Sequence, residues 1–318
     1  MGTQNAVLHS IDYEPGIAVP VQCLIDQGIS LEVVDDLLAK GVVAFSLIER
    51  PLAPVLRDCV QRSLDKAGLK GADIDTVILI TESFGELFDS GEASRQTFRQ
   101  IRNQTFELFY ELGIHTASLF CATYGGCTNL LQAALMAKSI VQQGLGRHVL
   151  LVAAERFSSL DARLMQEAVS IAGDGVAACV VSAEAPGRSA FRLDFVSMAP
   201  YKNLLPGADM AAMLLAMFRS MKNAAADCYD ACKMQPGDFR WVVLGDYNRN
   251  TTLTYSKLLG FAPDRTFLKN VGRLGHIPFD PLINLADLAT TGQVHRHDSV
   301  LLFLCGPVSC GAISVTVC

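Results

Sequence analysis

Short runs of apolar and β-branched residues alternate along the chain with segments in which apolar residues recur at helical spacing. This alternation is typical of helices packed on a largely parallel β-sheet, so the sequence predicts an α/β fold. In the first part of the chain, the apolar runs predict four strands, at residues 76–83, 114–122, 147–155 and 175–184.

The same succession of strands and helices begins again in the second part of the chain. Repetition of one supersecondary order indicates internal duplication rather than two unrelated domains. We therefore expect two halves, residues 1–185 and residues 186–318. The second half is predicted to contain two strands and then an antiparallel pair, at residues 239–248, 265–272, 299–305 and 312–318.

Residues 204–239, between these strands, carry apolar residues at helical spacing and no strand signal. The pattern predicts two helices, one of which packs in the core. Methionine is a flexible side chain that fills irregular gaps between other apolar groups. We therefore interpret the methionines of this segment as core residues rather than as part of a binding surface.

Composition limits the class of protein. Half of the 318 residues are apolar, which is enough to bury a large core. No run of about eighteen apolar residues predicts a membrane span, and residues 1–16 lack the pattern of a signal peptide. We expect a soluble cytoplasmic protein that does not bind membranes. A formal net charge of −6 argues against a nucleic-acid-binding protein, because phosphate contacts need a basic face.

The ten cysteines lie mostly inside apolar runs, as in the segment AACVV at residues 177–181. We expect reduced thiols, because disulfide frameworks are typical of small secreted domains. Cys228 and Cys232 lack a second pair of ligands at zinc spacing. The sequence therefore predicts neither a metal site nor a bound cofactor.

Two cysteines, Cys121 and Cys127, flank the point where a strand pattern gives way to a helix pattern. Cys121 falls inside the strand pattern, and we interpret it as a small core residue. Cys127 stands at the start of a helix that ends at Gly144, where unpaired backbone N–H groups favour a thiolate. Gly125 and Gly126 allow a tight bend and close approach by a substrate. Cys127 is therefore the candidate nucleophile.

Three segments carry a family resemblance. In residues 127–155 a cysteine opens an apolar helix that ends at a glycine, and the strand VLLVAAE follows. Farther on come IAGDGVAACVVSAE, with Asp174 and Gly175, and the C-terminal SVLLFLCGPVSCGAISVTV. These segments resemble the thiolase superfamily, and within it the β-ketoacyl-acyl-carrier-protein synthase III branch, over nearly all of the chain. The resemblance implies a five-layered αβαβα thiolase fold with two duplicated halves, normally a homodimer, and Cys127 as its catalytic cysteine.

Two other catalytic positions of that family are changed in this sequence. Family synthases carry a histidine after a strand of the second half, whereas residues 242–250, VVLGDYNRN, put Gly245 or Asp246 in its place. Asn248 in the same stretch is a further candidate for that position. The asparagine that follows later in the family is matched by His276. One histidine has been lost and another gained.

This exchange changes the expected reaction. Decarboxylative condensation needs two neutral donors that converge on a developing enolate oxygen, whereas acyl transfer needs one base for the acceptor. A cysteine with one histidine and a following aspartate resembles the acyltransferase offshoots of synthase III in natural-product pathways. That resemblance implies that Cys127 takes an acyl group from a carrier-bound or coenzyme A thioester. His276 then deprotonates a hydroxyl, an amine or another nucleophile, with Asp280 or Asp246 orienting the imidazole.

Two alternatives stay open. The first is a condensing enzyme of the synthase III type that forms a carbon–carbon bond with Cys127 and His276 alone. The second is a non-catalytic subunit that supports an active thiolase-fold partner in a heterodimer. The presence of both Cys127 and His276 argues against the second alternative, because a decayed site has no reason to hold both.

The oxyanion site departs from the family pattern as well. The family uses the amide of the catalytic cysteine and a glycine amide from a glycine-rich turn. In the turn CGPVSCG the matching position is Pro307, which has no N–H. We therefore expect Gly306 or Val308 to donate instead.

Carrier binding leaves a weak signal in the sequence. Arg95, Arg99 and Arg102 fall at helical spacing, and acyl carrier proteins are acidic partners that need a local basic patch. The tryptophan with which the family stacks on the adenine of coenzyme A has no match near the N-terminus. The substrate is therefore expected to be an acyl-phosphopantetheine on a carrier protein rather than free acyl-coenzyme A.

Overall fold

The structure is a computed structural model, and it describes residues 4–83, 98–165, 169–185, 189–201, 207 and 209–318. The strands are β1 (Val7–Pro15), β2 (Ile17–Pro20), β3 (Ala44–Leu47), β4 (Thr76–Ile80), β5 (Ser118–Ala122), β6 (His148–Glu155), β7 (Gly175–Ser182), β8 (Ala190–Pro200), β9 (Trp241–Val243), β10 (Ser299–Cys305) and β11 (Ser309–Val317). The α-helices are α1 (Leu31–Ala39), α2 (Leu52–Ala67), α4 (Phe98–Glu111), α5 (Asn129–Gln142), α6 (Leu160–Arg163), α7 (Met210–Cys232), α8 (Arg249–Leu258) and α9 (Asp280–Thr290).

Nine strands form one sheet in the order β5-β4-β6-β7-β1-β8-β11-β10-β9. Its centre is the antiparallel contact between β1 and β8, which joins residues 7–9 to residues 190–192. Outward from this contact, the first half places β1, β7, β6 and β4, and the second half places β8, β11, β10 and β9. These four strands follow the same order in both halves, and the first half adds β5 at its edge.

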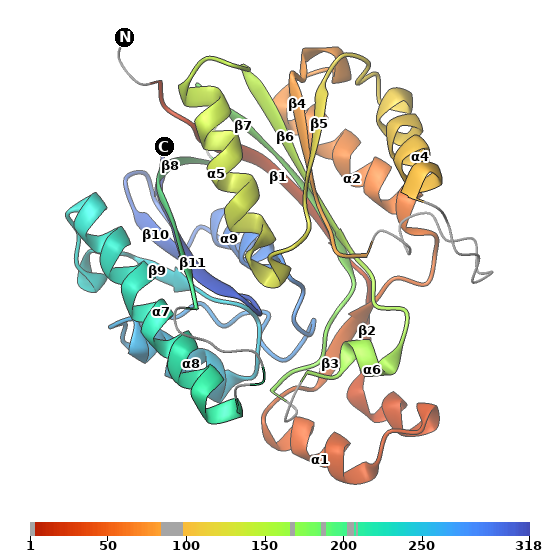
Figure 1. Ribbon diagram of the computed structural model, residues 1–318, viewed down its shortest axis with the longest axis vertical. Coiled ribbons are helices and arrows are strands. Elements are labelled where there is room, and N and C mark those ends of the chain that lie inside the picture. The colour runs from red at the N-terminus through yellow and green to blue at the C-terminus, as the bar shows by residue number, and fades with distance from the viewer. Residues whose placement is uncertain (1–3, 84–97, 166–168, 186–188, 202–206, 208) are drawn as a thin grey trace.

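The helices and the sheet make five layers in the expected αβαβα order. Helices α5 and α9 each contact strands of both halves and lie between them. Helices α2 and α4 cover the outer face of the first half, and α7 and α8 cover the outer face of the second, on the opposite side of the molecule (Figure 1).

Small and apolar residues explain why α5 and α9 occupy the middle layer. Ala133, Ala134 and Ala137 of α5 have no exposed surface, and their short side chains let the sheet approach the helix closely. In α9 every residue from Asp280 to Leu288 is buried. A helix that is apolar on most of its circumference packs inside a protein rather than on its surface. Cys127 lies two residues before α5, and His276 lies four residues before α9.

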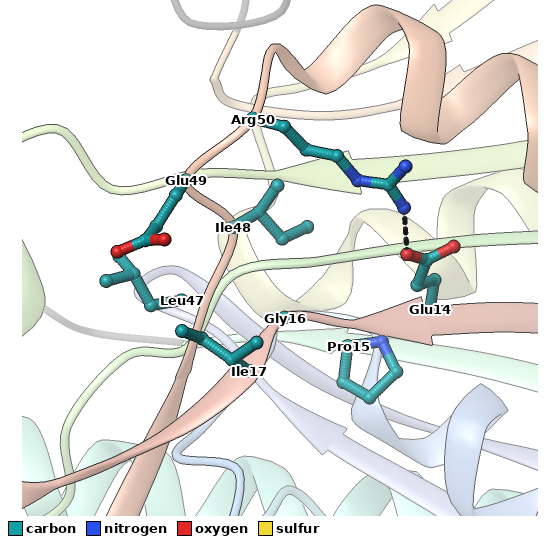
Figure 2. Close-up of a pocket in the computed structure, with 8 residues that line it drawn as sticks. All are labelled: Glu14, Pro15, Gly16, Ile17, Leu47, Ile48, Glu49 and Arg50. Atoms are coloured by element: carbon teal, nitrogen blue, oxygen red, sulfur yellow. Dashed lines mark hydrogen bonds and ion pairs between the residues drawn. The ribbon is translucent and has the colours of Figure 1, made fainter.

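A surface pocket of about 330 Å³ lies where β1 turns into β2, near the small β2–β3 sheet (Figure 2). Gly16 has no room for a side chain, because a Cβ atom there would strike the backbone of Leu47. Glu14 and Arg50 form an ion pair across the pocket (Figure 2). None of the residues that line this pocket is a candidate catalytic residue.

Two expectations about the second half are wrong. Residues 265–272 do not form a strand, since only Thr266 pairs with Val242 in an isolated parallel bridge. The chain turns just before it in a short helix, Pro263–Arg265, and again at Gly272, where φ is 75°. The described residues of the segment 204–239 contain one α-helix instead of two, because no glycine or proline interrupts α7.

Candidate active site

Residues 123–128, which we call the nucleophile turn because they carry the candidate nucleophile Cys127, connect β5 to α5. Cys127 lies in a single 3-10 turn, Gly126–Thr128, immediately before α5 begins at Asn129. Gly126 has a φ of 58°, and a Cβ atom there would lie 2.5 Å from Pro307 Cδ. A side chain at this position would therefore be strained and would clash.

Side-chain acceptors hold the backbone of this turn in place. The Gly125 N–H donates to Asn129 Oδ1 at 2.7 Å, and the Gly126 N–H donates to Glu82 Oε1 at 2.8 Å. The Thr128 hydroxyl donates to the Gly125 carbonyl at 2.7 Å. The sequence analysis did not predict Glu82, which lies more than forty residues away and follows β4.

His276 and Asp280 complete a row of contacts that begins at Cys127. The Cys127 sulfur lies 3.0 Å from His276 Nε2, and His276 Nδ1 lies 2.7 Å from Asp280 Oδ2. His276 and Asp280 are 4% and 1% exposed. The cysteine, histidine and aspartate that the sequence analysis selected are therefore brought together, and Asp280 is the aspartate that meets the imidazole.

The histidine is fixed by backbone as well as by Asp280. The His276 N–H donates to the Ile171 carbonyl at 2.7 Å, and the Gly173 N–H donates to the His276 carbonyl at 3.0 Å. Residues 171–173 precede β7 of the first half. The two halves of the chain therefore meet at His276.

Electrostatics favour the imidazolium form of His276. Burial alone would lower its pKa, but the Cys127 sulfur and the Asp280 carboxylate outweigh burial and raise the pKa of His276 well above 6.5. A proton can pass from the thiol to the imidazole over the 3.0 Å contact, which gives a thiolate beside an imidazolium.

Asp246 contacts Asp280, the last residue of the row of contacts from Cys127 through His276. Its backbone N–H donates to Asp280 Oδ2 at 2.6 Å, and its own carboxylate accepts from Asn284 Nδ2 at 2.9 Å. Burial, reinforced by Asp280, raises the pKa of Asp246 well above 3.8. Asn248 is engaged elsewhere, because it caps α8 by accepting from the Thr251 N–H at 2.9 Å.

A buried polar network continues beyond Asp246 and was not predicted from the sequence. Asn270 Nδ2 donates to Asn284 Oδ1 and to Asp287 Oδ2, both at 2.8 Å. Asp287 Oδ1 accepts from the Tyr13 hydroxyl at 2.7 Å and pairs with Lys269 at 2.9 Å. Asp280, Asn284 and Asp287 fall at helical spacing on α9, so one face of this helix carries the network.

Gly245 leaves little room for a side chain next to His276. A Cβ atom on Gly245 would lie 3.1 Å from His276 Cε1 and 3.0 Å from the Tyr247 ring. The Tyr247 ring packs on the imidazole with centroids 4.7 Å apart. A side chain at 245 would therefore compete with His276 and Tyr247 for the same space.

A cavity of about 350 Å³ opens beside Cys127. Its described walls hold no charged side chain. Four methionines contribute to it, three of them from α7, so the interpretation of these three as core residues alone is wrong. It holds for Met221 of the same helix, which is fully buried in the core. The lining residues are Cys127, Met165, Val169, Met210, Met213, Leu214, Met217, Tyr247, Tyr255, Cys305, Gly306 and Pro307.

The turn between β10 and β11 lies against the nucleophile turn. The Gly306 N–H donates to the Ser309 carbonyl at 2.9 Å, so it is engaged within the hairpin rather than directed into the cavity. Val308 is 55% exposed, and its carbonyl accepts from the Tyr201 N–H at 3.0 Å. The Gly306 amide is therefore a poor oxyanion donor in this conformation, and a role for Val308 stays a prediction.

The structure also places Cys121 and two of the three candidate carrier-binding arginines. Cys121 is exposed on β5, the edge strand of the sheet, so its interpretation as a core residue is wrong. Its position at the edge explains this, because no strand covers it. Arg99 and Arg102 are exposed on α4, whereas Arg95 lies outside the described residues.

Comparisons with known proteins agree with this geometry. Residues 123–198 match the family model described as 3-Oxoacyl-[acyl-carrier-protein (ACP)] synthase III. The β-ketoacyl-[acyl-carrier-protein] synthase III of Chlamydia caviae is 24% identical over 278 residues, which cover 80% of this chain and 78% of that protein. The chain is similar to synthase III proteins over most of its length.

Solved structures with a similar fold match nearly the whole chain. The structure titled ChlB3 acyltransferase gives a TM-score of 0.79 at 20% identity and covers 98% of both chains. The 3-oxoacyl-[acyl-carrier-protein] synthase III from Aquifex aeolicus VF5 gives 0.77 at 17% identity, covering 99% of this chain and 100% of that one. The predicted thiolase fold is confirmed. No helix in the described part of the chain combines the length and the hydropathy needed to span a bilayer.

Proposed function

We propose that this synthase III-like protein is an acyltransferase that works through an acyl thioester on Cys127. The contact row from the Cys127 sulfur through His276 to Asp280, at 3.0 Å and 2.7 Å, is the observation that supports it. A nucleophile, a base within hydrogen-bond reach and a group that orients the base are the parts that nucleophilic acyl transfer needs.

In the first step, His276 Nε2 takes the Cys127 proton and the thiolate attacks the carbonyl carbon of an acyl-carrier-protein or acyl-coenzyme A thioester. The carbon–sulfur bond of the donor then breaks. The departing thiolate takes the proton back from His276, and the acyl group stays on Cys127. The Asp280 carboxylate stabilises the imidazolium while it exists.

In the second step, His276 is neutral and accepts the proton of an incoming hydroxyl or amine. The acceptor oxygen or nitrogen attacks the Cys127 thioester, the new ester or amide forms, and the Cys127 thiolate is released next to the imidazolium. One base serves both steps, so the reaction needs no second histidine. Ketone-forming attack by carbon would need a carbanion source in addition.

A condensing enzyme is the second candidate, and the names of the curated relatives favour it. The arrangement around position 245 argues against decarboxylation of a malonyl donor, because Gly245 offers no donor side chain and Asp246 is turned to Asn284. A malonyl carboxylate in the cavity would also meet no cation among the described lining residues. An apolar acyl group suits these walls better.

The edge strand β5 supports a dimer. Phe120 on this strand is 44% exposed and Tyr124 just beyond it is 93% exposed. An edge strand with exposed apolar side chains readily pairs with another chain. We expect two copies to associate through β5. A light-scattering mass of one chain in solution would instead favour the heterodimer with another thiolase-fold protein.

Intact-mass spectrometry after incubation with a panel of acyl-carrier-protein and acyl-coenzyme A thioesters tests the proposal. We expect a mass gain equal to one acyl group, which persists in Cys121→Ala and vanishes in Cys127→Ala. No gain with any donor would favour the non-catalytic subunit. Malonyl thioester is then added to the acylated protein, and release of carbon dioxide would replace the acyltransferase proposal with the condensing enzyme.

A further inference from the structure

A second pair of thiols lies in the wall of the Cys127 cavity. Cys305 ends β10, and Cys310 lies directly opposite it on β11. Their sulfur atoms are 3.1 Å apart, and the residues are 8% and 0% exposed. Cys305 lines the cavity together with Cys127. No step of the proposed acyl transfer uses either thiol.

The hairpin geometry suits a disulfide between them. Opposite residues on antiparallel strands have Cα atoms about 4.5–5.5 Å apart, within the range of about 4.4–6.8 Å found for disulfides. The sulfurs would have to approach by roughly 1 Å, which side-chain rotation can supply. The turn beyond the pair is already closed by the hydrogen bond from the Gly306 N–H to the Ser309 carbonyl.

Direct oxidation of Cys305 is unfavourable. An oxidant reacts with a thiolate, and burial together with Cys310 raises the pKa of Cys305 well above 9. Cys127 differs, because it is partly exposed and its sulfur is paired with His276. Its charge also contributes to the raised pKa of Cys305, so the two sulfurs are within electrostatic reach.

We propose that Cys305 and Cys310 are a resolving dithiol that rescues Cys127 after oxidation by a hydroperoxide, a role that rests on Cys127 being the reactive thiolate of the proposed function. The Cys127 thiolate attacks the peroxide, the oxygen–oxygen bond breaks, and Cys127 becomes a sulfenic acid while water or an alcohol leaves. The Cys305 thiol then attacks the sulfur of the Cys127 sulfenic acid, the thiol proton passes to the departing hydroxyl oxygen, water leaves, and a mixed disulfide forms.

The Cys310 sulfur completes the sequence by attacking Cys305. The bond between Cys127 and Cys305 breaks, the Cys305–Cys310 disulfide forms, and Cys127 returns as a thiol. Two thiols are oxidised to one disulfide, and one hydrogen peroxide is reduced to two waters. Without this exchange a sulfenic acid proceeds to sulfinic acid, which is irreversible for most proteins.

Reduced full-length protein is treated with hydrogen peroxide, quenched with an alkylating agent and mapped by mass spectrometry without reductant. In the wild type we expect one new disulfide between Cys305 and Cys310, an alkylatable Cys127 and undiminished acylation of Cys127. Cys310→Ser should stop at the disulfide between Cys127 and Cys305, and acylation should return only after reduction. Cys318→Ser, which removes an exposed thiol, should behave like the wild type.

Two further variants complete the test. Cys305→Ser should let Cys127 gain two oxygen atoms, and Cys127→Ala should form the Cys305–Cys310 disulfide about tenfold more slowly. Equal rates of Cys127 sulfinic acid formation in wild type and Cys305→Ser would overturn the proposal, provided that both proteins give the same circular dichroism spectrum. A disulfide that forms in a protein that no donor acylates would leave the dithiol intact and reject the acyltransferase instead.

Discussion

The two halves of the chain place their reactive groups alike but support them differently. Cys127 stands just before α5, and His276 stands just before α9. Around Cys127, acceptors such as Glu82 and Asn129 hold backbone N–H groups of the turn. Around His276, the buried carboxylate of Asp280 contacts the imidazole itself. Duplication of one fold has thus supplied two equivalent positions, and different side chains have given them different tasks.

This difference predicts that changes around Cys127 and changes around His276 affect the reaction in different ways. Hydrogen bonds to the backbone of the nucleophile turn fix the position of Cys127, so their loss should slow the reaction at every pH. The Cys127 sulfur and the buried Asp280 carboxylate raise the pKa of His276, so loss of Asp280 should also change the dependence of the rate on pH.

Removal of the base should have the largest effect. We expect His276→Ala to lower the rate of acyl transfer about 10³-fold, because a positioned general base contributes roughly 10²–10⁴-fold. The rate is measured with an acyl thioester and an amine acceptor by quantifying the product in samples quenched at successive times. His295→Ala, which changes an exposed histidine, serves as the matched control. A loss of less than about tenfold in His276→Ala would mean that another group acts as the base.

Asp280→Asn should lower the rate about 10²-fold, because the imidazole loses the partner that orients it. It should also lower the pKa of His276, since the Asp280 carboxylate contributes to raising that pKa. The rate of Cys127 alkylation by iodoacetamide, followed against pH, reports the ion pair. Its midpoint should move to higher pH in the variant. A lower rate with an unchanged midpoint would show that Asp280 only positions His276.

Asp246→Asn should change stability with pH. Because burial and Asp280 raise the pKa of Asp246, the folded protein keeps a proton that the unfolded chain releases. The free energy of unfolding should therefore fall as pH rises above about 4, by at most about 1.4 kcal/mol per pH unit from this group. The variant keeps an acceptor for Asn284 but should lose this slope. Urea unfolding of both proteins at about pH 5 and about pH 7.5 measures how the free energy of unfolding changes with pH. A difference between wild type and variant that is the same at both pH values would contradict the prediction.

Sequence patterns predicted the side chains that meet at the candidate site better than the residues that support them. Cys127 follows from a strand-to-helix junction with two glycines, and His276 follows from family spacing. The contact of Glu82 with Gly126, by contrast, joins segments that are far apart in the sequence. Such a contact leaves no periodic signal near either residue. The polar network of Asn284 was missed for the same reason, because a buried asparagine on an apolar helix is distinguished only by its partners.

Fold predictions failed where local pattern and tertiary position disagree. Cys121 lies in an apolar run but at an open sheet edge, and an apolar run does not reveal whether a neighbouring strand will cover it. Strands β1 and β8 were not predicted, although their contact joins the two halves of the sheet. Residues 265–272 show the converse, because their apolar pattern is present but Lys269 and Asn270 contact Asp287 and only Thr266 forms a bridge to the sheet.

The smallest effect is expected in the nucleophile half, and it completes the contrast. Glu82→Ala removes the acceptor of the Gly126 N–H and should slow acylation of Cys127 about tenfold, since water can partly replace this exposed side chain. The midpoint of the alkylation profile should stay where it is in the wild type, because no carboxylate next to His276 has changed. Glu82→Gln keeps a carbonyl oxygen for the same N–H and should acylate at nearly the wild-type rate.

Comparison of the Glu82 and Asp280 variants on one alkylation profile decides whether the two halves divide the work in this way. If Glu82→Gln is as slow as Glu82→Ala, then the charge of Glu82 rather than its hydrogen bond acts on Cys127. The midpoint would then move in both Glu82 variants as it does in Asp280→Asn, and the nucleophile half would control titration as well. An unmoved midpoint with rescue by glutamine assigns position to the first half and charge to the second.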